Sequence, residues 1–220
     1  MHIPDGLMSP EVLAAGWVLA LPAVAWAVTK VNKTIDERVV PFMAILAAGI
    51  FVAQMVNFPI GGGTTGHLIG AALAVALLGL CGGILVMTVI LIIQGLVFGD
   101  GGITAMGLNV LNMAVIAPLV AWIILMAVPE RRRTLAVPLA AWASVFVAAT
   151  ACGVQLAVSF WLHPGQYGID GAIAIPTMML THAVIGVGEA AITGGIVLYL
   201  SKVAPEVLAM RPRKAKEADA

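Results

Sequence analysis

Long apolar runs recur along almost the whole chain, and they constrain its fold more than any other feature. Of the 220 residues, 61% are hydrophobic and only 10% are charged. A helix that crosses a bilayer needs about 20 mostly apolar residues, so this length allows roughly six or seven crossings. The sequence therefore predicts one all-α, polytopic membrane domain.

Seven apolar segments can be assigned as transmembrane helices. They are 10–29, 40–57, 66–81, 83–98, 106–128, 135–162 and 176–202. The third and fourth come from one apolar run that is broken only at Leu80-Cys81-Gly82-Gly83. Each half is short for a full crossing, so the pattern allows either a tight hairpin or two tilted short helices.

The basic residues predict the orientation. Seven spans that start outside place every Lys and Arg on the cytoplasmic side, where such residues are enriched. The 11 residues are Lys30, Lys33, Arg38, Arg131, Arg132, Arg133, Lys202, Arg211, Arg213, Lys214 and Lys216. A single span over 66–98 would divide these loops between the two sides. We therefore predict an outside N-terminus and a cytoplasmic C-terminus.

Three regions follow from this assignment: an N-terminal segment over 1–9, a membrane domain over 10–204, and a cytoplasmic tail over 205–220. The tail is polar enough to be disordered. No basic region precedes the first apolar run, so we expect no signal peptide. Cys81 and Cys152 lie in separate apolar segments, and we expect both to pack in the core.

The first two residues can form a chelating unit. The terminal amine of Met1, the backbone nitrogen of His2 and the His2 ring can bind one ion, and His67 can add a fourth nitrogen. Four nitrogens in a plane suit Ni²⁺, Cu²⁺ or a similar late transition ion. Pro4 and the turn signal Asp5-Gly6 would let segment 1–9 fold back onto the membrane domain. A frayed terminus is the alternative.

His67 follows a glycine-rich sequence, PIGGGTTG, that permits a close backbone approach. At the start of the third span, the helix dipole would favour the neutral imidazole, which is the form that binds metal. A hydrogen bond to a loop carbonyl is the alternative. The topology also places His163 outside, where we expect it to be solvated without a partner.

Six further polar residues lie in or beside spans: Gln54, Asn57, Asn109, Asn112, His182 and Glu189. Amides in spans usually bond between helices, and the alternative is that they hold an imidazole in one tautomer. His182 and Glu189 are about 10 Å apart along one helix face, too far to bond to each other. We expect both to join a structural polar network. Asp100 is expected to cap or turn an outer loop.

The sequence resembles the CbiM/NikM family, the substrate-binding (S) components of energy-coupling factor (ECF) transporters for cobalt and nickel. The resemblance rests on MHIPDG, QMVNFPIGGGTTGHLIGA, DGGITAMGLNVLNMA and HAVIGVGEA, and it covers nearly the whole membrane region. It implies seven helices and a near-planar metal site. The implied ligands are the Met1 amine, the backbone and ring nitrogens of His2, and the His67 ring.

The same resemblance implies a multi-pass protein of the prokaryotic cell (inner) membrane. Its partners would be a membrane coupling (T) subunit, two ATPase subunits and often a small accessory membrane protein. The chain has no G-x-x-x-x-G-K-[ST] loop, so we expect ATP hydrolysis in the partners and not here. The predicted substrate is Co²⁺ or Ni²⁺. We expect no organic cofactor and no nucleic-acid partner.

Two other functions compete with this interpretation. A self-contained cation channel or secondary metal permease usually shows paired intramembrane acids or inverted repeats. Here only Glu189 lies deep in a span, and no convincing repeat is present. An intramembrane enzyme built on His182 and Glu189 would lack a companion motif and a nucleophile.

Overall fold

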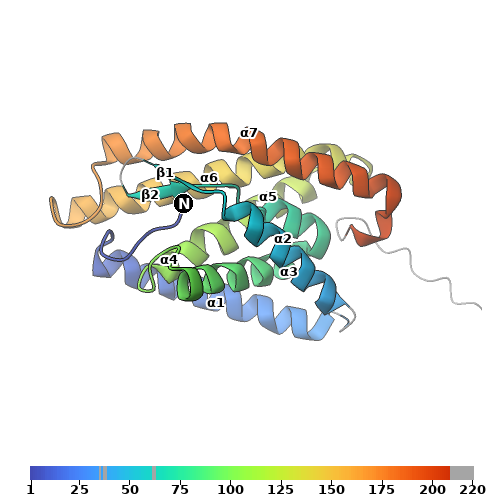
Figure 1. Ribbon diagram of the computed structural model, residues 1–220, viewed down its shortest axis with the longest axis horizontal. Helices are drawn as coiled ribbons and strands as arrows, with labels where there is room; N and C mark the ends of the chain where they lie inside the picture. Colours follow the sequence, from blue (N-terminus) through green and yellow to red (C-terminus); the bar gives the residue numbers. More distant parts are fainter. Residues whose placement is uncertain (35, 37–38, 61–62, 209–220) are drawn as a thin grey trace, which may run out of the picture.

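The protein is a bundle of helices that run along its longest axis, with one small β-hairpin at one end (Figure 1). The computed structural model describes residues 1–34, 36, 39–60 and 63–208. Its α-helices are α1 (Pro10–Thr34), α2 (Val40–Gln54), α3 (Ala71–Ile93), α4 (Met106–Val110), α5 (Ala117–Ala127), α6 (Arg133–Leu162) and α7 (Gly171–Val203). The strands are β1 (Phe58–Ile60) and β2 (Thr64–Gly66).

Shorter helical pieces extend or connect these elements. The π-helix η2 (Gln94–Phe98) continues α3, and the π-helix η3 (Leu111–Ile116) joins α4 to α5. The 3₁₀ turns are η4 (Glu130–Arg132) and η5 (Pro205–Val207). Single π-turns inside helices often accompany functional sites, and here one begins at Gln94.

Five helical segments of the described chain are long and apolar enough to cross a membrane. They are Pro10–Lys33, Ala71–Phe98, Met106–Ala127, Glu130–Leu162 and Gly171–Val203, whereas α2 is shorter. The predicted all-α membrane fold is therefore confirmed. The last helix begins earlier than predicted because the carboxylate of Asp170 accepts a 2.8 Å hydrogen bond from the N–H of Ala172 and caps its start.

The run predicted to hold the third and fourth spans folds back on itself, as in the tight hairpin that the pattern allowed, but it does so one residue before the predicted break. Gly79 has non-helical dihedrals (φ 73°, ψ 179°) inside α3. A Cβ on Gly83 would lie 3.3 Å from the backbone nitrogen of Val75, whereas residues eight apart in a straight helix are separated by about 12 Å. The chain therefore folds back at Gly79. The arm before it, 71–78, is too short to cross a bilayer as a helix.

The β-hairpin also departs from the predicted spans. β1 and β2 are antiparallel, with Phe58 opposite Gly66, so the helix predicted from residue 66 does not start there. It starts at Ala71, after Gly70 in a left-handed conformation (φ 79°). His67 consequently lies in the extended connection between the hairpin and α3.

The two ends of the bundle differ in their content of Lys and Arg residues. One end, which we call the site end, carries the N-terminal segment, the β-hairpin and the loops 99–105 and 163–170. The opposite end, which we call the basic end, is formed by the C-terminal ends of α1 and α7, by η4 and by the start of α6 (Figure 1). These parts of the chain carry the described Lys and Arg residues: Lys30, Lys33, Arg131, Arg132, Arg133 and Lys202. Arg38 and the basic residues after 208 lie outside the described residues.

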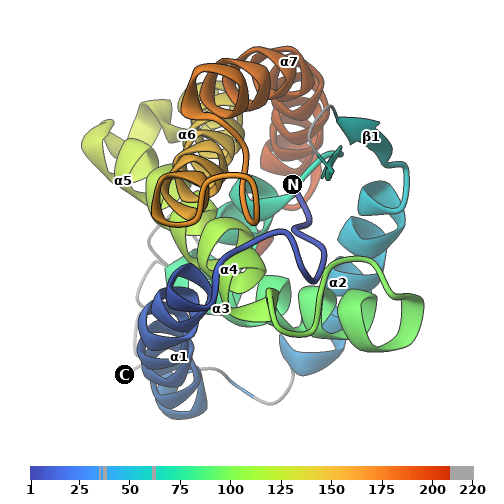
Figure 2. The ribbon, with the colours of Figure 1, turned by 90° about the vertical axis from the view of Figure 1, so that its left-hand side faces the viewer.

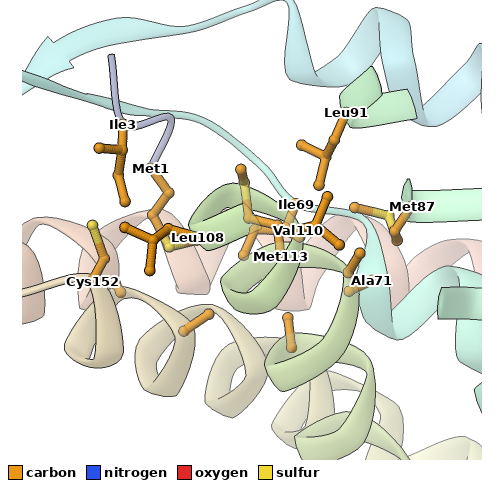
Figure 3. Close-up of a cluster of buried hydrophobic side chains, with 14 of the residues drawn as sticks. Met1, Ile3, Ile69, Ala71, Met87, Leu91, Leu108, Val110, Met113 and Cys152 are labelled. Carbon is orange, nitrogen blue, oxygen red and sulfur yellow. The ribbon is translucent and has the colours of Figure 1, made fainter. Parts of the chain in front are cut away.

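The N-terminal segment forms part of the hydrophobic core. Viewed from the site end, it lies among the helices (Figure 2). The side chains of Met1 and Ile3 are fully buried in one cluster with Leu108, Met113 and Cys152 (Figure 3). A fully buried side chain of this size contributes about 1.5–3 kcal/mol. The alternative of a frayed terminus is therefore not observed.

The remaining predictions concern the cysteines and the tail. Cys152 is buried and Cys81 partly buried, and both are free thiols. The predicted tail starts too early, since Pro205–Val207 form η5 and Leu208 is buried. Residues 209–220 lie outside the described residues.

A cavity of about 320 Å³ lies between α2, the start of α3 and α7.

Candidate metal site

The N-terminal segment is held in place through its backbone. The N–H of Ile3 donates to Oδ1 of Asn109 (2.8 Å), and Nδ2 of Asn109 donates back to the carbonyl of Ile3 (3.1 Å). The N–H of Gly102 donates to the same carbonyl (2.8 Å). A single amide on α4 thus fixes both polar groups of Ile3, and the position of His2 follows.

Asp5 forms a second anchor. Its carboxylate accepts hydrogen bonds from the N–H groups of Ile103 (2.9 Å) and Thr104 (2.8 Å) and from the Thr104 hydroxyl (2.5 Å). These groups lie in the turn just before α4, so Asp5 ties the N-terminal segment to that turn. The hydroxyl bond is the main reason that the pKa of Asp5 lies below its usual value.

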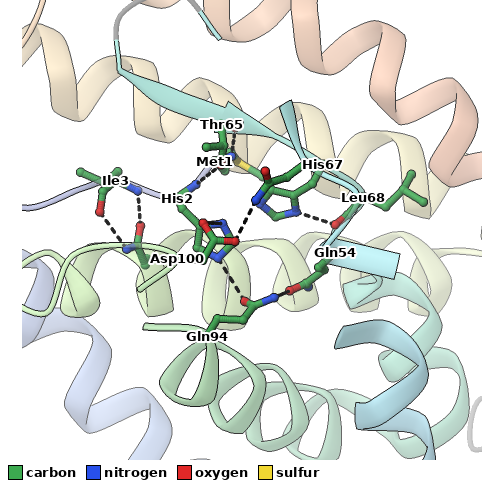
Figure 4. Close-up of polar contacts among 11 residues, drawn as sticks. Met1, His2, Ile3, Gln54, Thr65, His67, Leu68, Gln94 and Asp100 are labelled. Carbon is green, nitrogen blue, oxygen red and sulfur yellow. Dashed lines mark hydrogen bonds and ion pairs between the residues drawn. The ribbon is translucent and has the colours of Figure 1, made fainter. Parts of the chain in front are cut away.

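The two predicted ligand histidines meet at this end of the bundle. The rings of His2 and His67 stack with centroids 4.6 Å apart and an interplanar angle of 26° (Figure 4). Both residues are at most 2% exposed. The sequence pattern predicted that the N-terminus and the glycine-rich segment before His67 lie on the same side of the membrane domain. The two histidines that it indicated are in contact in the structure.

Hydrogen bonds fix the tautomer of each ring. Nδ1 of His67 lies 2.7 Å from the carbonyl oxygen of Leu68 and must donate to it, which leaves Nε2 with a lone pair. Nε2 of His2 lies 3.1 Å from Oε1 of Gln94, which leaves Nδ1 free. Neither His67 Nε2 nor His2 Nδ1 has a hydrogen-bond partner, although both are buried. Two imidazole lone pairs are thus available to a cation.

A chain of amides sets the direction of the His2 bond (Figure 4). Nε2 of Gln54 donates to the carbonyl of Ile69 (2.5 Å), and Nε2 of Gln94 donates to Oε1 of Gln54 (2.9 Å). Oε1 of Gln94 is therefore the atom that faces His2. The carbonyl of Ile69 can only accept a hydrogen bond, so it fixes the orientation of both amide groups. His2 must then donate to Oε1 of Gln94 and carries its proton on Nε2.

The terminal amine completes a set of nitrogens. It bonds to the carbonyl of Thr65, and Oγ1 of Thr65 lies 3.3 Å from both the amine and the His2 N–H. Burial lowers the pKa of the amine to about 5, and burial with the nearby amine lowers the pKa of His2 to about 3. The amine and the His2 ring are therefore both neutral at pH 7, so a metal ion need not displace a proton to reach their lone pairs.

The described residues contain no cluster of three His, Cys, Asp or Glu side chains suited to a metal. The nitrogens of this site come instead from two side chains and from the start of the backbone. An amine, the next backbone nitrogen and Nδ1 of the same histidine form adjacent chelate rings. This donor set suits Ni²⁺ or a neighbouring transition ion.

Comparisons with known proteins identify the family. The sequence matches the CbiM family, described as the cobalt uptake substrate-specific transmembrane region, over residues 2–207. The chain belongs to the CbiM family. The resemblance seen in the sequence is thereby confirmed.

Two CbiM relatives are fused proteins. The fused nickel transport protein NikMN of Rhodobacter capsulatus is 38% identical over 99% of this chain and 66% of its own length. A NikMN relative from Archaeoglobus fulgidus is 35% identical over 98% of this chain and 70% of its own. This chain thus spans about two thirds of each relative.

A solved structure shares the fold. The crystal structure of a truncated transition metal transporter has a TM-score of 0.87 and 39% identity, and the match covers 92% of this chain and 99% of that one. A second crystal structure of a transition metal transporter has the same TM-score and 40% identity.

Several polar residues of this CbiM protein have roles other than those predicted. Asn109 binds the backbone of Ile3 and not another helix, whereas Asn112 pairs with Gln155 of α6 through two 2.8 Å bonds, as expected of an interhelical amide. Nδ1 of His182 bonds to the carbonyl of Met178 in its own helix (2.9 Å). His163, predicted to be solvated, lies 3.1 Å from Oε1 of Glu11.

Glu189 supports the loop that follows His67. Its carboxylate accepts hydrogen bonds from the N–H groups of Ile69 (2.8 Å) and Gly70 (2.6 Å), and it is 2% exposed. The backbone just after His67 is therefore tied to the middle of α7. The predicted position of His67 at a helix N-terminus is wrong, since three residues, 68–70, separate it from α3.

Two residues of the site were missed or misplaced by sequence reasoning. Gln94 lies near the end of an apolar run and was not singled out, although a buried amide in such a run is itself a signal. Asp100 is not only a loop residue: Oδ1 lies 3.4 Å from His2 Nδ1, and Oδ2 accepts a 2.8 Å hydrogen bond from Asn57. Burial raises the pKa of Asp100.

Gln94→Leu should weaken Ni²⁺ binding about 10- to 100-fold, the usual effect of removing a group that orients a metal ligand. The His2 ring would lose the acceptor that fixes its tautomer. Gln155→Leu is the matched control, because it also leaves a buried amide unpaired, at a cost of about 1–3 kcal/mol in stability. Calorimetric titration would contradict the role of Gln94 if both variants bound Ni²⁺ equally well.

Proposed function

We propose that this chain is the substrate-binding (S) component of an ECF-type transporter that takes up cobalt or nickel. The observation that carries the proposal is the pair of stacked, buried rings whose free nitrogens, His2 Nδ1 and His67 Nε2, have no hydrogen-bond partner. The proposed ligands are these two nitrogens, the Met1 amine and the backbone nitrogen of His2. The names of the fused relatives support nickel, and the family description supports cobalt.

The proposed topology has seven passes, with the site end outside. The third pass would be made by the extended residues 67–70 together with the short helical arm 71–78, and the fold-back at Gly79 would start the fourth. The basic end would then face the cytoplasm, which agrees with the excess of Lys and Arg in cytoplasmic loops. This orientation places the buried metal site at the outer end of the bundle, in the inner membrane of a prokaryote.

The motor is proposed to reside in other chains. The sequence has no G-x-x-x-x-G-K-[ST] loop for ATP. A membrane coupling subunit and two ATPase subunits would drive uptake. A small accessory membrane protein would complete the complex, and the greater length of the fused relatives is consistent with such an added part.

Uptake of radioactive Ni²⁺ and Co²⁺ would test the function. Cells that express this chain with its coupling and ATPase partners should accumulate one of the ions, and His67→Ala should reduce uptake to background. Expression of this chain alone should give little uptake. Full uptake by this chain alone would instead favour the self-contained permease, and purified protein that binds neither ion would refute the proposed function.

A further inference from the structure

The site includes a carboxylate that the nitrogen ligands leave unused. Oδ1 of Asp100 lies 3.4 Å from Nδ1 of His2, the buried nitrogen that has no hydrogen-bond partner. Its other oxygen accepts a hydrogen bond from Nδ2 of Asn57 (2.8 Å). Figure 4 shows Asp100 beside the His2 ring. A carboxylate next to a lone pair is unfavourable until a cation lies near both groups.

The loop around Asp100 is shaped for this close approach. Gly99 (φ 68°) and Gly101 (φ 95°) flank it in left-handed conformations that favour glycine. A Cβ at Gly101 would lie 2.9 Å from Nδ2 of Asn109 and 3.2 Å from the His2 ring. The dihedrals favour glycine at both positions, and at Gly101 the close contacts leave no room for a side chain.

The charge of the loaded site requires compensation. A divalent ion bound by two neutral rings, a neutral amine and one deprotonated backbone nitrogen leaves a net charge of +1. Met1, His2 and His67 are at most 2% exposed, and an unpaired charge in such a place is costly. One carboxylate would make the site neutral.

Asp100 is the acid in the right place. Its side chain is 14% exposed, so it faces both the site and the surface at the site end. Two other acids near the site are already used: Asp5 binds the N–H groups before α4, and Glu189 binds those of Ile69 and Gly70.

We infer that Asp100 is the counter-charge of the metal-loaded site and attracts the incoming divalent ion toward His2. The inference rests on the proposed function and adds a residue outside the nitrogen ligand set. Nearby negative charge raises both the association rate and the affinity of a cation, and the effect on the rate falls with ionic strength.

Asp100→Asn and Asp100→Ala test this role together, because both remove the charge: the amide keeps an oxygen for Asn57, and alanine adds no N–H that could bond to the lone pair of His2 Nδ1. Stopped-flow mixing of purified full-length protein with Ni²⁺ should show slower association that has lost most of its dependence on ionic strength. Affinity from calorimetric titration should fall about 10- to 100-fold. The d–d spectrum at saturating Ni²⁺ should be unchanged, because the nitrogens remain. Asp100→Glu should restore most of the affinity.

Asp170→Asn is the matched control. It removes the same charge at the site end, and Asn is an equally good cap for α7. The inference is overturned if the Asp100 and Asp170 variants have the same affinity and salt dependence. It is also overturned if Asp100→Asn alters the spectrum, since the residue would then act by holding the ligands in place. Failure of the unaltered protein to bind Ni²⁺ would refute the proposed function itself.

Discussion

His2→Ala should weaken Ni²⁺ binding by more than about 100-fold, beyond the usual effect of residues that only orient ligands. The substitution removes Nδ1, which closes the chelate with the terminal amine and the backbone nitrogen. It also removes the ring that stacks on His67 at 4.6 Å and leaves Gln94 without its partner. Calorimetric titration would measure the affinity, and thermal unfolding would show that the protein remains folded.

His163→Ala is the control for this experiment. It also removes a histidine at the site end, but one whose partners are Glu11 and Tyr167. It should bind Ni²⁺ like the unaltered protein. If His2→Ala retained an affinity within about tenfold of the control, the role of the His2 ring as a ligand would be wrong.

A chain with two residues added before Met1 should lose tight binding almost completely. The extension turns the terminal amine, which has a free lone pair, into a peptide nitrogen, whose lone pair is delocalised and which would have to lose its proton before it could bind the ion. Met1 is also fully buried, with its amine bonded to Thr65, so the added residues would have no room. Two residues are needed because a histidine third from a terminus can chelate with the new amine by itself.

The same two residues added at the C-terminus provide the control. Mass spectrometry would confirm where each chain begins, and titration with Ni²⁺ would compare their affinities. Tight binding by the N-terminally extended chain would show that the Met1 amine is not a ligand, while leaving His2 and His67 in place as candidates.

The sequence predicted the membrane fold and the two histidines because both rest on local patterns. Apolar runs mark helices whatever their packing, and the chemistry of Met1-His2 is that of adjacent atoms. The position of His67 was predicted on the correct side of the bundle, but its local structure was not. The hairpin of β1 and β2 depends on pairing across Gly63, and three-residue strands have almost no periodicity.

The contacts around the site could not be read from the sequence, because they join distant segments. Gln94 reaches His2 across 92 positions, and Glu189 reaches Ile69 across 120. Gly79 was missed for another reason. Two consecutive glycines, Gly82-Gly83, predict a helix break more strongly than one. In the structure, however, Gly79 has the positive φ, and Gly82 and Gly83 pack closely against Leu78 and Val75 of the preceding arm.

The hydrogen bonds of Glu189 have a mechanical consequence. The position of His67 is coupled to α7, because the N–H groups of Ile69 and Gly70, just after it, donate to the carboxylate of Glu189. His2 follows α4, because Asn109 grips the adjacent residue Ile3. The rings of His2 and His67 are therefore each coupled to a different helix. A sliding of α7 against α4 would move the two rings apart without unfolding either segment.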